Sequence, residues 1–404
     1  MKVGFIGLTS DIVAHMSPAL AAGFEFTQGE AAHQQLLERH AAALRTQGVD
    51  IVVVMSELGI HKDYQLAQHI RRGSVDVFFS AHTHEATFEL LQTASGALVV
   101  EAGNDGYLGR MDVTVKNGRI QSHHWQLLEI GADIPEDARI ARAVARARAP
   151  FLADNIAMQV PMMGPVQRLT QPIDTVIGYT AQPLDRRHAL ESSFNNFSTD
   201  MLRSVAGTEF ALAPGFRFDS PVPATEMLLE DNTVATGAIT LEDVYRYFPV
   251  VYSLATATTD GANLRTLLET ALTEVYSADA FNQAGGWMPG LAGLQAEVDL
   301  SRPDGARVLS LAHADGRPIG LTDTLTVAGC RRPIDAGDTL CSYPGFSAIE
   351  PLVNPATGSA YTVVDFFMDA LAKGYGPAEP RDSLHDVSDT PVWPAAAFVQ
   401  PLLQ

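Results

Sequence analysis

Residues 49–85 read VDIVVVMSELGIHKDYQLAQHIRRGSVDVFFSAHTHE. The apolar run from Ile51 to Met55 predicts a strand, the residues from about Lys62 to Arg71 predict a helix, and Val75 to Phe79 predict a second strand. Near-continuous apolar runs suit strands that are buried on both faces of a parallel sheet, and the helix between them completes a βαβ unit. This stretch therefore predicts an α/β fold with parallel strands.

Three polar side chains, Glu57, His82 and His84, follow the ends of these two strands. Ligand chemistry in parallel sheets collects just past the carboxyl ends of the strands. Because side chains at i and i+2 of an extended segment point the same way, His82 and His84 are expected to face one centre. Imidazoles together with a carboxylate suit zinc, manganese or iron. The stretch thus predicts a metal site, with a solvated His-Thr-His turn as the alternative.

The regions on either side extend the same pattern. Lys2 to Leu8 predict a strand, and Glu30 to Gln47 predict a helix that Gly48 ends. Alternating residues in 96–103 and 109–115 predict further strands. Together with the central stretch, these elements predict a β-α-β-α-β arrangement in layers.

Helical spacing returns further along the chain. Residues 135–160 predict one long helix capped by Asp133, and the Pro- and Gly-rich segment 161–172 predicts a tether between domains. Amphipathic patterns also predict helices at 261–276 and 362–371.

The composition of the chain limits the classes of function that are expected. The chain has 404 residues, enough for two or three domains, and 46% of them are hydrophobic. The 27 Lys and Arg residues against 47 Asp and Glu residues give a net charge of −20, which opposes binding to nucleic acid or to anionic membranes. No apolar run is long enough to cross a membrane, so neither nucleic acid nor membrane is an expected partner.

Two features of the sequence bear on the cellular compartment. Residues 1–16 lack the apolar core and cleavage pattern of a signal peptide. Cys330 and Cys341 could pair in an exported protein and would stay reduced in the cytosol. The residues alone leave both possibilities open.

The Ser-Glu-Leu-Gly turn at 56–59 and Ala-His-Thr-His-Glu at 81–85 resemble the last two metal-binding loops of the calcineurin-like metallophosphoesterases, in particular of 5′-nucleotidases and SoxB thiosulfohydrolases. Glu57 stands where this family usually has a histidine, and Ala81 where it has a glycine. The resemblance implies divalent metal ions, Mn or Zn, possibly two in the complete protein. It also implies Glu57, His82 and His84 as ligands, with His84 catalytic.

Other motifs of that family are absent from the start of this chain. Its two-metal site begins with Asp-x-His, Gly-Asp and Gly-Asn-His-Asp/Glu segments, and none of these precedes Val49. The opening strand resembles the one that follows the Gly-Asn-His segment. The resemblance therefore implies a partial metallophosphoesterase sandwich in 1–131, a linker helix and tether in 132–172, and a 5′-nucleotidase-type C-terminal α/β domain in 173–404.

Residues 191–217 resemble a segment of that C-terminal domain, in which a helix carrying Asn and Asp precedes a strand and an arginine. Asn196 and Asp200 match the helix, and Arg217 matches the arginine. A guanidinium offers a planar fork suited to a tetrahedral anion or a carboxylate. Arg217 is therefore the predicted catalytic and substrate-anchoring residue, with an internal ion pair as the alternative, and Asn196 and Asp200 are predicted to bind substrate.

Residues 281–294, FNQAGGWMPGLAGL, resemble a Gly-Gly segment of SoxB. Because glycines let backbone approach a ligand closely, Gly285 and Gly286 are predicted to contact substrate. Trp287 replaces an aspartate of that family, and it either walls the pocket or packs in a core. Val250 stands near the place where nucleotidases have a base-stacking aromatic, which weakens the case for a nucleoside substrate.

Two functions follow from these patterns. The first is a metal-dependent hydrolase of phosphate or sulfur esters that uses a water activated by two metals, acting on a small anionic ester or a carrier-bound sulfur ester. The second is an incomplete or noncatalytic member of the family, from a truncated or split gene, that serves as a binding or scaffold module. The resemblance implies a periplasmic location with paired cysteines, and a cytoplasmic location is the alternative.

Overall fold

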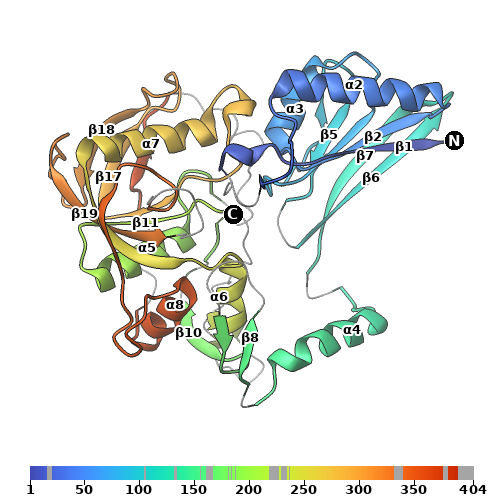
Figure 1. Cartoon of the computed structure of the whole chain (residues 1–404). Helices are drawn as coiled ribbons and strands as arrows, with labels where there is room; N and C mark the ends of the chain where they lie inside the picture. Colours follow the sequence, from blue (N-terminus) through green and yellow to red (C-terminus); the bar gives the residue numbers. More distant parts are fainter. Residues whose placement is uncertain are drawn as a thin grey trace. The chain divides into compact units, whose positions relative to one another are not determined.

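The computed structural model describes residues 1–15, 21–103, 106–131, 134–154, 156–160, 167–180, 182, 184–186, 188–217, 227–228, 234–235, 237–331, 340–375 and 381–389. The chain forms two compact units (Figure 1). The described residues of unit 1 lie within Met1–Gly131 and Leu272–Gly286, and those of unit 2 lie within Ala132–Ala271 and Trp287–Asp389.

Unit 1 is built on a five-stranded sheet. Its order is β1 (Val3–Leu8), β2 (Ile51–Ser56), β3 (Val77–Ser80), β5 (Leu98–Glu101) and β4 (Leu91–Gln92). The first four strands are parallel and the short β4 is antiparallel to β5. The predicted βαβ unit and the α/β class of this part of the chain are confirmed.

Both faces of this sheet are covered (Figure 1). Helices α2 (Glu30–Thr46) and α3 (Ile60–His69) lie on one face, over a core that includes Leu37, Val54 and Phe78. On the other face, the hairpin of β6 (Tyr107–Lys116) and β7 (Arg119–Glu129) packs against Ile51, Val53, Val77 and Leu98. Burial on both faces accounts for the near-continuous apolar runs of β2 and β3.

A segment from late in the sequence completes unit 1. Helix α7 (Gly261–Tyr276) has the predicted bounds, and its end leads into a 3-10 turn, η3 (Ala280–Asn282). Phe281 packs against the core beneath α2 and α3, and the backbone N–H of Ala280 donates to Gln65 of α3 at 2.8 Å. Leu272–Gly286 thus groups with unit 1, while the predicted domain bounds of 1–131, 132–172 and 173–404 stay a prediction.

The helix predicted at 135–160 is shorter than expected. Helix α4 spans Ala138–Arg148, and a 3-10 turn, η2 (Ala149–Phe151), and strand β8 (Met158–Val160) follow it. Pro150 has no backbone N–H, so it cannot continue the helical hydrogen bonds. The N-cap is Asp137, whose carboxylate accepts from the N–H groups of residues 139 and 140. Asp133 lies outside the described residues.

Unit 2 contains a second five-stranded sheet. Its order is β16 (Gly290–Ala292), β11 (Phe210–Ala213), β19 (Thr324–Arg331), β15 (Ser253–Asp260) and β20 (Ser347–Pro351). Strand β11 is parallel to β19 and antiparallel to β16. Helix α5 (Ser193–Ala206) packs against β11 and β16 and begins at the N-cap Ser192.

Aromatic side chains form the core beside α5. Phe194 stacks on Tyr247 with ring centroids 3.6 Å apart, and Phe248 and Phe367 join them. The further elements of unit 2 are β9 (Gln167–Leu169), β10 (Val176–Thr180), β12 (Met227–Leu228), β13 (Val234–Ala235), β14 (Gly237–Thr240), α6 (Leu241–Tyr247), β17 (Leu294–Val298), β18 (Val308–His313), α8 (Val363–Ala372) and β21 (Leu384–Asp386).

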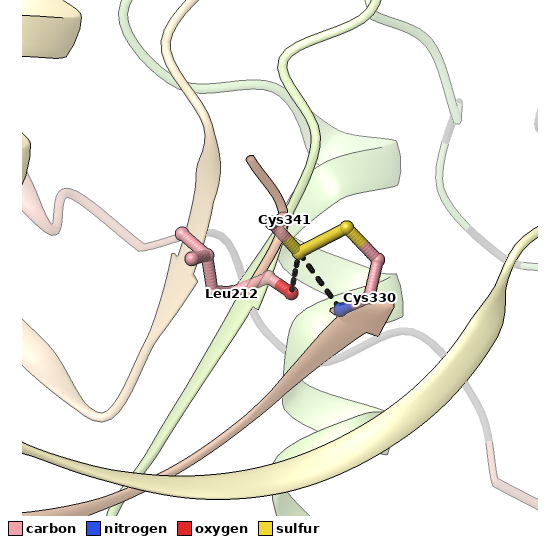
Figure 2. Close-up of a disulfide and its surroundings, with 3 residues drawn as sticks. All are labelled: Leu212, Cys330 and Cys341. Carbon is pink, nitrogen blue, oxygen red and sulfur yellow. Dashed lines mark hydrogen bonds between the residues drawn. A yellow bond between two sulfur atoms is a disulfide. The ribbon is translucent and has the colours of Figure 1, made fainter. Parts of the chain in front are cut away.

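Cys330 and Cys341 form a disulfide in unit 2 (Figure 2). Both cysteines are buried, and the backbone N–H of Cys330 donates to the Sγ atom of Cys341 at 2.8 Å. The bond joins the end of β19 to the chain that follows residues 332–339. The pairing that the family resemblance implied is confirmed.

Asp63 of α3 joins the ends of two strands in unit 1. Its fully buried carboxylate accepts hydrogen bonds from Ser56 Oγ at 2.7 Å and from Ser80 Oγ at 2.6 Å. These serines are paired and are the last residues of β2 and β3. Burial raises the pKa of Asp63 from 3.8 to about 7, against the opposing effect of the two hydrogen bonds.

The raised pKa of Asp63 predicts a pH-dependent stability. Between pH 3.8 and about 7 the folded protein binds more protons at this residue than the unfolded protein, so the free energy of unfolding falls as the pH rises through this range. Asp63→Asn removes the titration. Urea unfolding of both proteins from pH 4 to 7 should show the wild type losing a few kcal/mol relative to the variant, at about 1.4 kcal/mol per pKa unit. A pH-independent difference would contradict this account.

Removal of the disulfide is expected to lower the free energy of unfolding of the protein. It closes a short loop with a sequence separation of 11, so its absence enlarges the ensemble of the unfolded chain. The double variant Cys330→Ser, Cys341→Ser should unfold with a free energy lower by about 2 to 3 kcal/mol in urea titrations. A reducing agent should lower the stability of the wild type by a similar amount and leave the double variant unchanged.

Candidate functional site

The candidate site of unit 1 lies where β2 and β3 end. Glu57 directly follows β2, and its backbone N–H donates to the carbonyl of Leu8 at 3.0 Å. His82 follows β3 by two residues. The Nδ1 atom of His82 lies 3.8 Å from the Oε2 atom of Glu57, so the paired strands bring together two of the three predicted metal ligands.

The backbone around the two histidines is not extended. His82 has a φ of 87° and His84 a φ of 55°, both in the left-handed region that non-glycine residues seldom adopt. The expectation that His82 and His84 lie in an extended segment is therefore wrong, and a common centre for the two imidazoles stays a prediction. Thr83 is buried between them, and the side chain of His84 is half-buried.

The fit of a metal ion is partial. Glu57 and His82 supply two donors, but the described residues contain no group of three or more His, Cys, Asp or Glu side chains arranged to hold a metal. A zinc site normally uses three or four protein ligands. The residues present thus do not complete a metal site, and the metal-binding roles of Glu57, His82 and His84 stay a prediction.

Gly285 lies against His82 within unit 1. Its φ is 86°, and a Cβ atom built on it would lie only 2.5 Å from the Nε2 atom of His82. A side chain at this position is therefore excluded unless His82 moves. The backbone of Gly285 covers Nε2, which is buried, while Nδ1 is the ring nitrogen that faces Glu57. Gly286 is half-buried and follows in the same segment.

A layer of buried polar side chains lies beneath this loop. Thr83 Oγ1 donates to Glu101 Oε2 at 2.5 Å and accepts from the N–H of Ile60 at 3.1 Å. His61 Nε2 lies 2.9 Å from Glu85 Oε2 in a second contact with almost no exposed surface. Sequence patterns did not single out these residues. Glu101 directly follows the apolar residues 98–100, which is a weak signal, whereas His61 and Asp63 lie in the polar stretch 61–65 and give none.

His61 also connects to the late segment of unit 1. Its Nδ1 atom lies 2.7 Å from the Oε1 atom of Gln283, whose Nε2 group donates to the carbonyl of Ser277 at 2.9 Å. Because Gln283 uses its amide N–H group on a carbonyl, its oxygen is the atom that accepts from His61. This buried contact holds the segment that carries Gly285.

Arg217 and Trp287 form the candidate site of unit 2. Arg217 lies just beyond β11, and its guanidinium carbon is 3.7 Å from the centroid of the Trp287 ring. Both side chains are buried. The N–H of Trp287 donates to the carbonyl of Gly215 at 2.8 Å, and a Cβ atom on Gly215 would lie 1.9 Å from the carbonyl oxygen of Trp287. Glycine at 215 thus permits the close approach that stacks the two predicted residues.

Asn196 and Asp200 bind an arginine that the sequence analysis did not single out. The guanidinium of Arg381 donates to the Asp200 carboxylate, and to the side-chain oxygens of Asn196 at 3.0 Å and Thr199 at 3.1 Å. Burial raises the pKa of Asp200, although Arg381 favours its charged form. These contacts tie α5 to the segment after residue 380, and substrate binding by Asn196 and Asp200 stays a prediction.

Comparison with known proteins agrees with the fold. Residues 176–337 match the family model of the 5′-nucleotidase C-terminal domain. The chain is 23% identical over 342 residues to the snake venom 5′-nucleotidase of Naja atra, a match that covers 77% of this chain and 58% of that protein.

Two solved structures, both of Thermus thermophilus proteins, have a similar fold. The sulfate thiohydrolase SoxB superposes with a TM-score of 0.73 and 19% identity, covering 95% of this chain and 63% of that one. The 5′-nucleotidase precursor gives a TM-score of 0.66 and 21% identity, covering 96% and 73%. This chain thus spans about three fifths of the length of the venom enzyme and of SoxB. By these matches, residues 176–337 form a 5′-nucleotidase C-terminal domain, in a chain whose fold is similar to those of SoxB and of the 5′-nucleotidase precursor.

Proposed function

We propose that the protein acts in the hydrolysis of an anionic ester, a phosphate or sulfur ester, and that unit 2 holds the anionic group at Arg217. The observation that carries this proposal is the buried guanidinium of Arg217 stacked on Trp287 just beyond β11. Both residues were singled out from the sequence as substrate-binding candidates, and unit 2 brings them into contact.

The stacking suits recognition of an oxyanion. The Trp287 ring covers one face of the guanidinium and attracts its charge, and a guanidinium carries its N–H donors in its own plane. Two such donors match two oxygens of a phosphate, sulfate or carboxylate group. Because the net charge of the chain is −20, an anionic substrate needs a local positive site of this kind.

Aromatic packing in unit 2 favours a sulfur ester over a nucleotide. Phe248 and Tyr252 flank the segment in which nucleotidases are expected to carry a base-stacking ring, and both are buried with ring centroids 5.9 Å apart. They form part of the core, and the residues between them, Pro249, Val250 and Val251, have no aromatic face.

The number of metal-binding side chains in unit 1 limits the catalytic role that we assign to this chain. A divalent ion, Mn or Zn, would supply a Lewis acid and an activated water to such a hydrolysis. Glu57 and His82 provide two donors, and the described residues do not add a third, so no metal-dependent step is assigned to this chain. The same observation favours a second candidate function, in which the chain binds the anionic ester without hydrolysing it.

The disulfide bears on location. We propose a periplasmic or extracellular site for the protein, because the paired Cys330 and Cys341 persist in an oxidising compartment. No helix among the residues described has the length and apolar character that crossing a membrane requires.

Substitution of Arg217 tests the proposed anion site. Arg217→Gln should weaken the binding of thiosulfate or inorganic phosphate, measured by calorimetry, by at least about tenfold, because charge-assisted hydrogen bonds are lost. Trp287→Leu should weaken it about threefold, since the charge remains without its ring support. Arg110→Gln, which alters an exposed ion pair of unit 1, is the matched control and should bind normally. Equal binding by Arg217→Gln and the wild type would refute the assignment.

Activity separates the two candidate functions. The wild type is incubated with p-nitrophenyl phosphate, adenosine 5′-monophosphate and a thiosulfate ester, with added Mn²⁺ or Zn²⁺, and metal uptake is measured on the same samples. Ester hydrolysis that depends on metal and on Arg217 supports the hydrolase. Anion binding that depends on Arg217 without metal uptake or turnover supports the binding module.

A further inference from the structure

The loop between β3 and β4 contains an unusual backbone conformation. His82 and His84 both have positive φ, at 87° and 55°, and they flank Thr83. A left-handed backbone places the Cβ atom of a non-glycine residue close to the carbonyl oxygen that follows it, so two such residues in one short loop are unfavourable by themselves. Strained conformations of this kind persist only where the surrounding structure imposes them.

Thr83 makes the contacts that can impose this conformation. Its hydroxyl donates to the carboxylate of Glu101, the last residue of β5, and accepts from the N–H of Ile60, the first residue of α3. One buried hydroxyl therefore ties the histidine loop to a helix and a strand of unit 1, both labelled in Figure 1.

The methyl group of Thr83 is also confined. A Cβ atom built on Gly59 would lie 2.5 Å from Thr83 Cγ2, so the methyl fills the space that the glycine leaves open. Gly59 itself has a φ of 98° and directly precedes α3. Both branches of the threonine are thus placed, the hydroxyl by hydrogen bonds and the methyl by packing.

A second buried contact anchors the far side of the loop. The Glu85 carboxylate lies 2.9 Å from His61 Nε2, and both side chains have almost no exposed surface. Burying the carboxylates of Glu85 and Glu101 carries a large desolvation cost, and apolar side chains of similar size would fill the same space without it. What the carboxylates add is a fixed position for the segment from His82 to Glu85.

We propose that Thr83 and Glu101 form a clasp that holds His82 and His84 in their left-handed conformation, and that both are positioning residues for the His82 and Glu57 pair. The inference rests on the proposed function, because it takes this pair as the candidate site of unit 1. It adds that neither Thr83 nor Glu101 is a ligand, and that their role is to set the backbone from which the imidazole projects.

The experiment compares Thr83→Val, which keeps the shape but removes the hydroxyl, with Thr83→Ser, which keeps the hydroxyl. Hydrogen exchange of peptides spanning residues 81–87 is measured by mass spectrometry on the full chain. Thr83→Val should exchange at least about tenfold faster than the wild type, as expected for a lost buried hydrogen bond, and Thr83→Ser should stay within about twofold. Thr46→Val removes a hydroxyl from the surface of α2 and is the control, with no change expected in this loop.

A spectroscopic readout follows the conformation itself. In protein labelled at histidine, the Cα chemical shifts of His82 and His84 are sensitive to their backbone conformation, and the signals are assigned with His82→Asn and His84→Asn. Both shifts should move away from the wild-type values in Thr83→Val and stay at those values in Thr83→Ser. If Thr83→Val does not fold, Glu101→Gln, which keeps an uncharged acceptor, should speed exchange by roughly threefold.

Two results would overturn the proposal. One is a folded Thr83→Val protein with the exchange and chemical shifts of the wild type. The other is a Thr83→Ser protein as altered as Thr83→Val, which would assign the effect to the methyl group. Phosphate or thiosulfate binding at Arg217 is measured on the same variants and should be unchanged, so failure of the clasp and failure of the anion site give different outcomes.

Discussion

The parallel pairing of β2 with β3 is the constraint on which the candidate site of unit 1 depends. The pairing ends in register at Ser56 and Ser80, and the buried carboxylate of Asp63 accepts hydrogen bonds from both hydroxyls. Glu57 directly follows one serine and His82 follows the other by two residues. The 3.8 Å distance between their side chains therefore results from the pairing at the ends of β2 and β3. A parallel sheet thus converts strand register into side-chain proximity.

The two units use different means to place charged groups. In unit 1, buried acids hold a loop through hydroxyl and imidazole groups, at the cost of removing charge from water. In unit 2, a guanidinium is held on one face by an aromatic ring, and Gly215 lets the two loops approach to within a backbone hydrogen bond. Hydrogen-bond donors around the edge of the guanidinium are what an oxyanion would use, which is why the proposed substrate site lies at Arg217.

Local patterns predicted much of the fold and less of the site. The apolar runs of β2 and β3 and the spacing of α7 depend on burial, which a sequence records directly. The helix predicted for 135–160 is longer than α4, because the helical pattern continues beyond Pro150. Pro150 has no backbone N–H and ends the helical hydrogen bonds. Positive φ at His82 and His84 is imposed by partners that are distant in sequence. The residues of the loop carry no signal of those partners, so their types alone predict an extended segment. The contact between α5 and Arg381 spans 181 positions and leaves no periodic signal.

The discontinuity of unit 1 has a consequence for how the chain is made. Phe281 fills part of a core whose other members lie before residue 100, and Gln283 bonds to His61. Most of unit 1 therefore emerges from the ribosome long before the residues that complete its core. The early sheet must persist through synthesis of α5, β11 and β15 with a gap in its hydrophobic interior, a stage at which a chaperone has apolar surface to recognise.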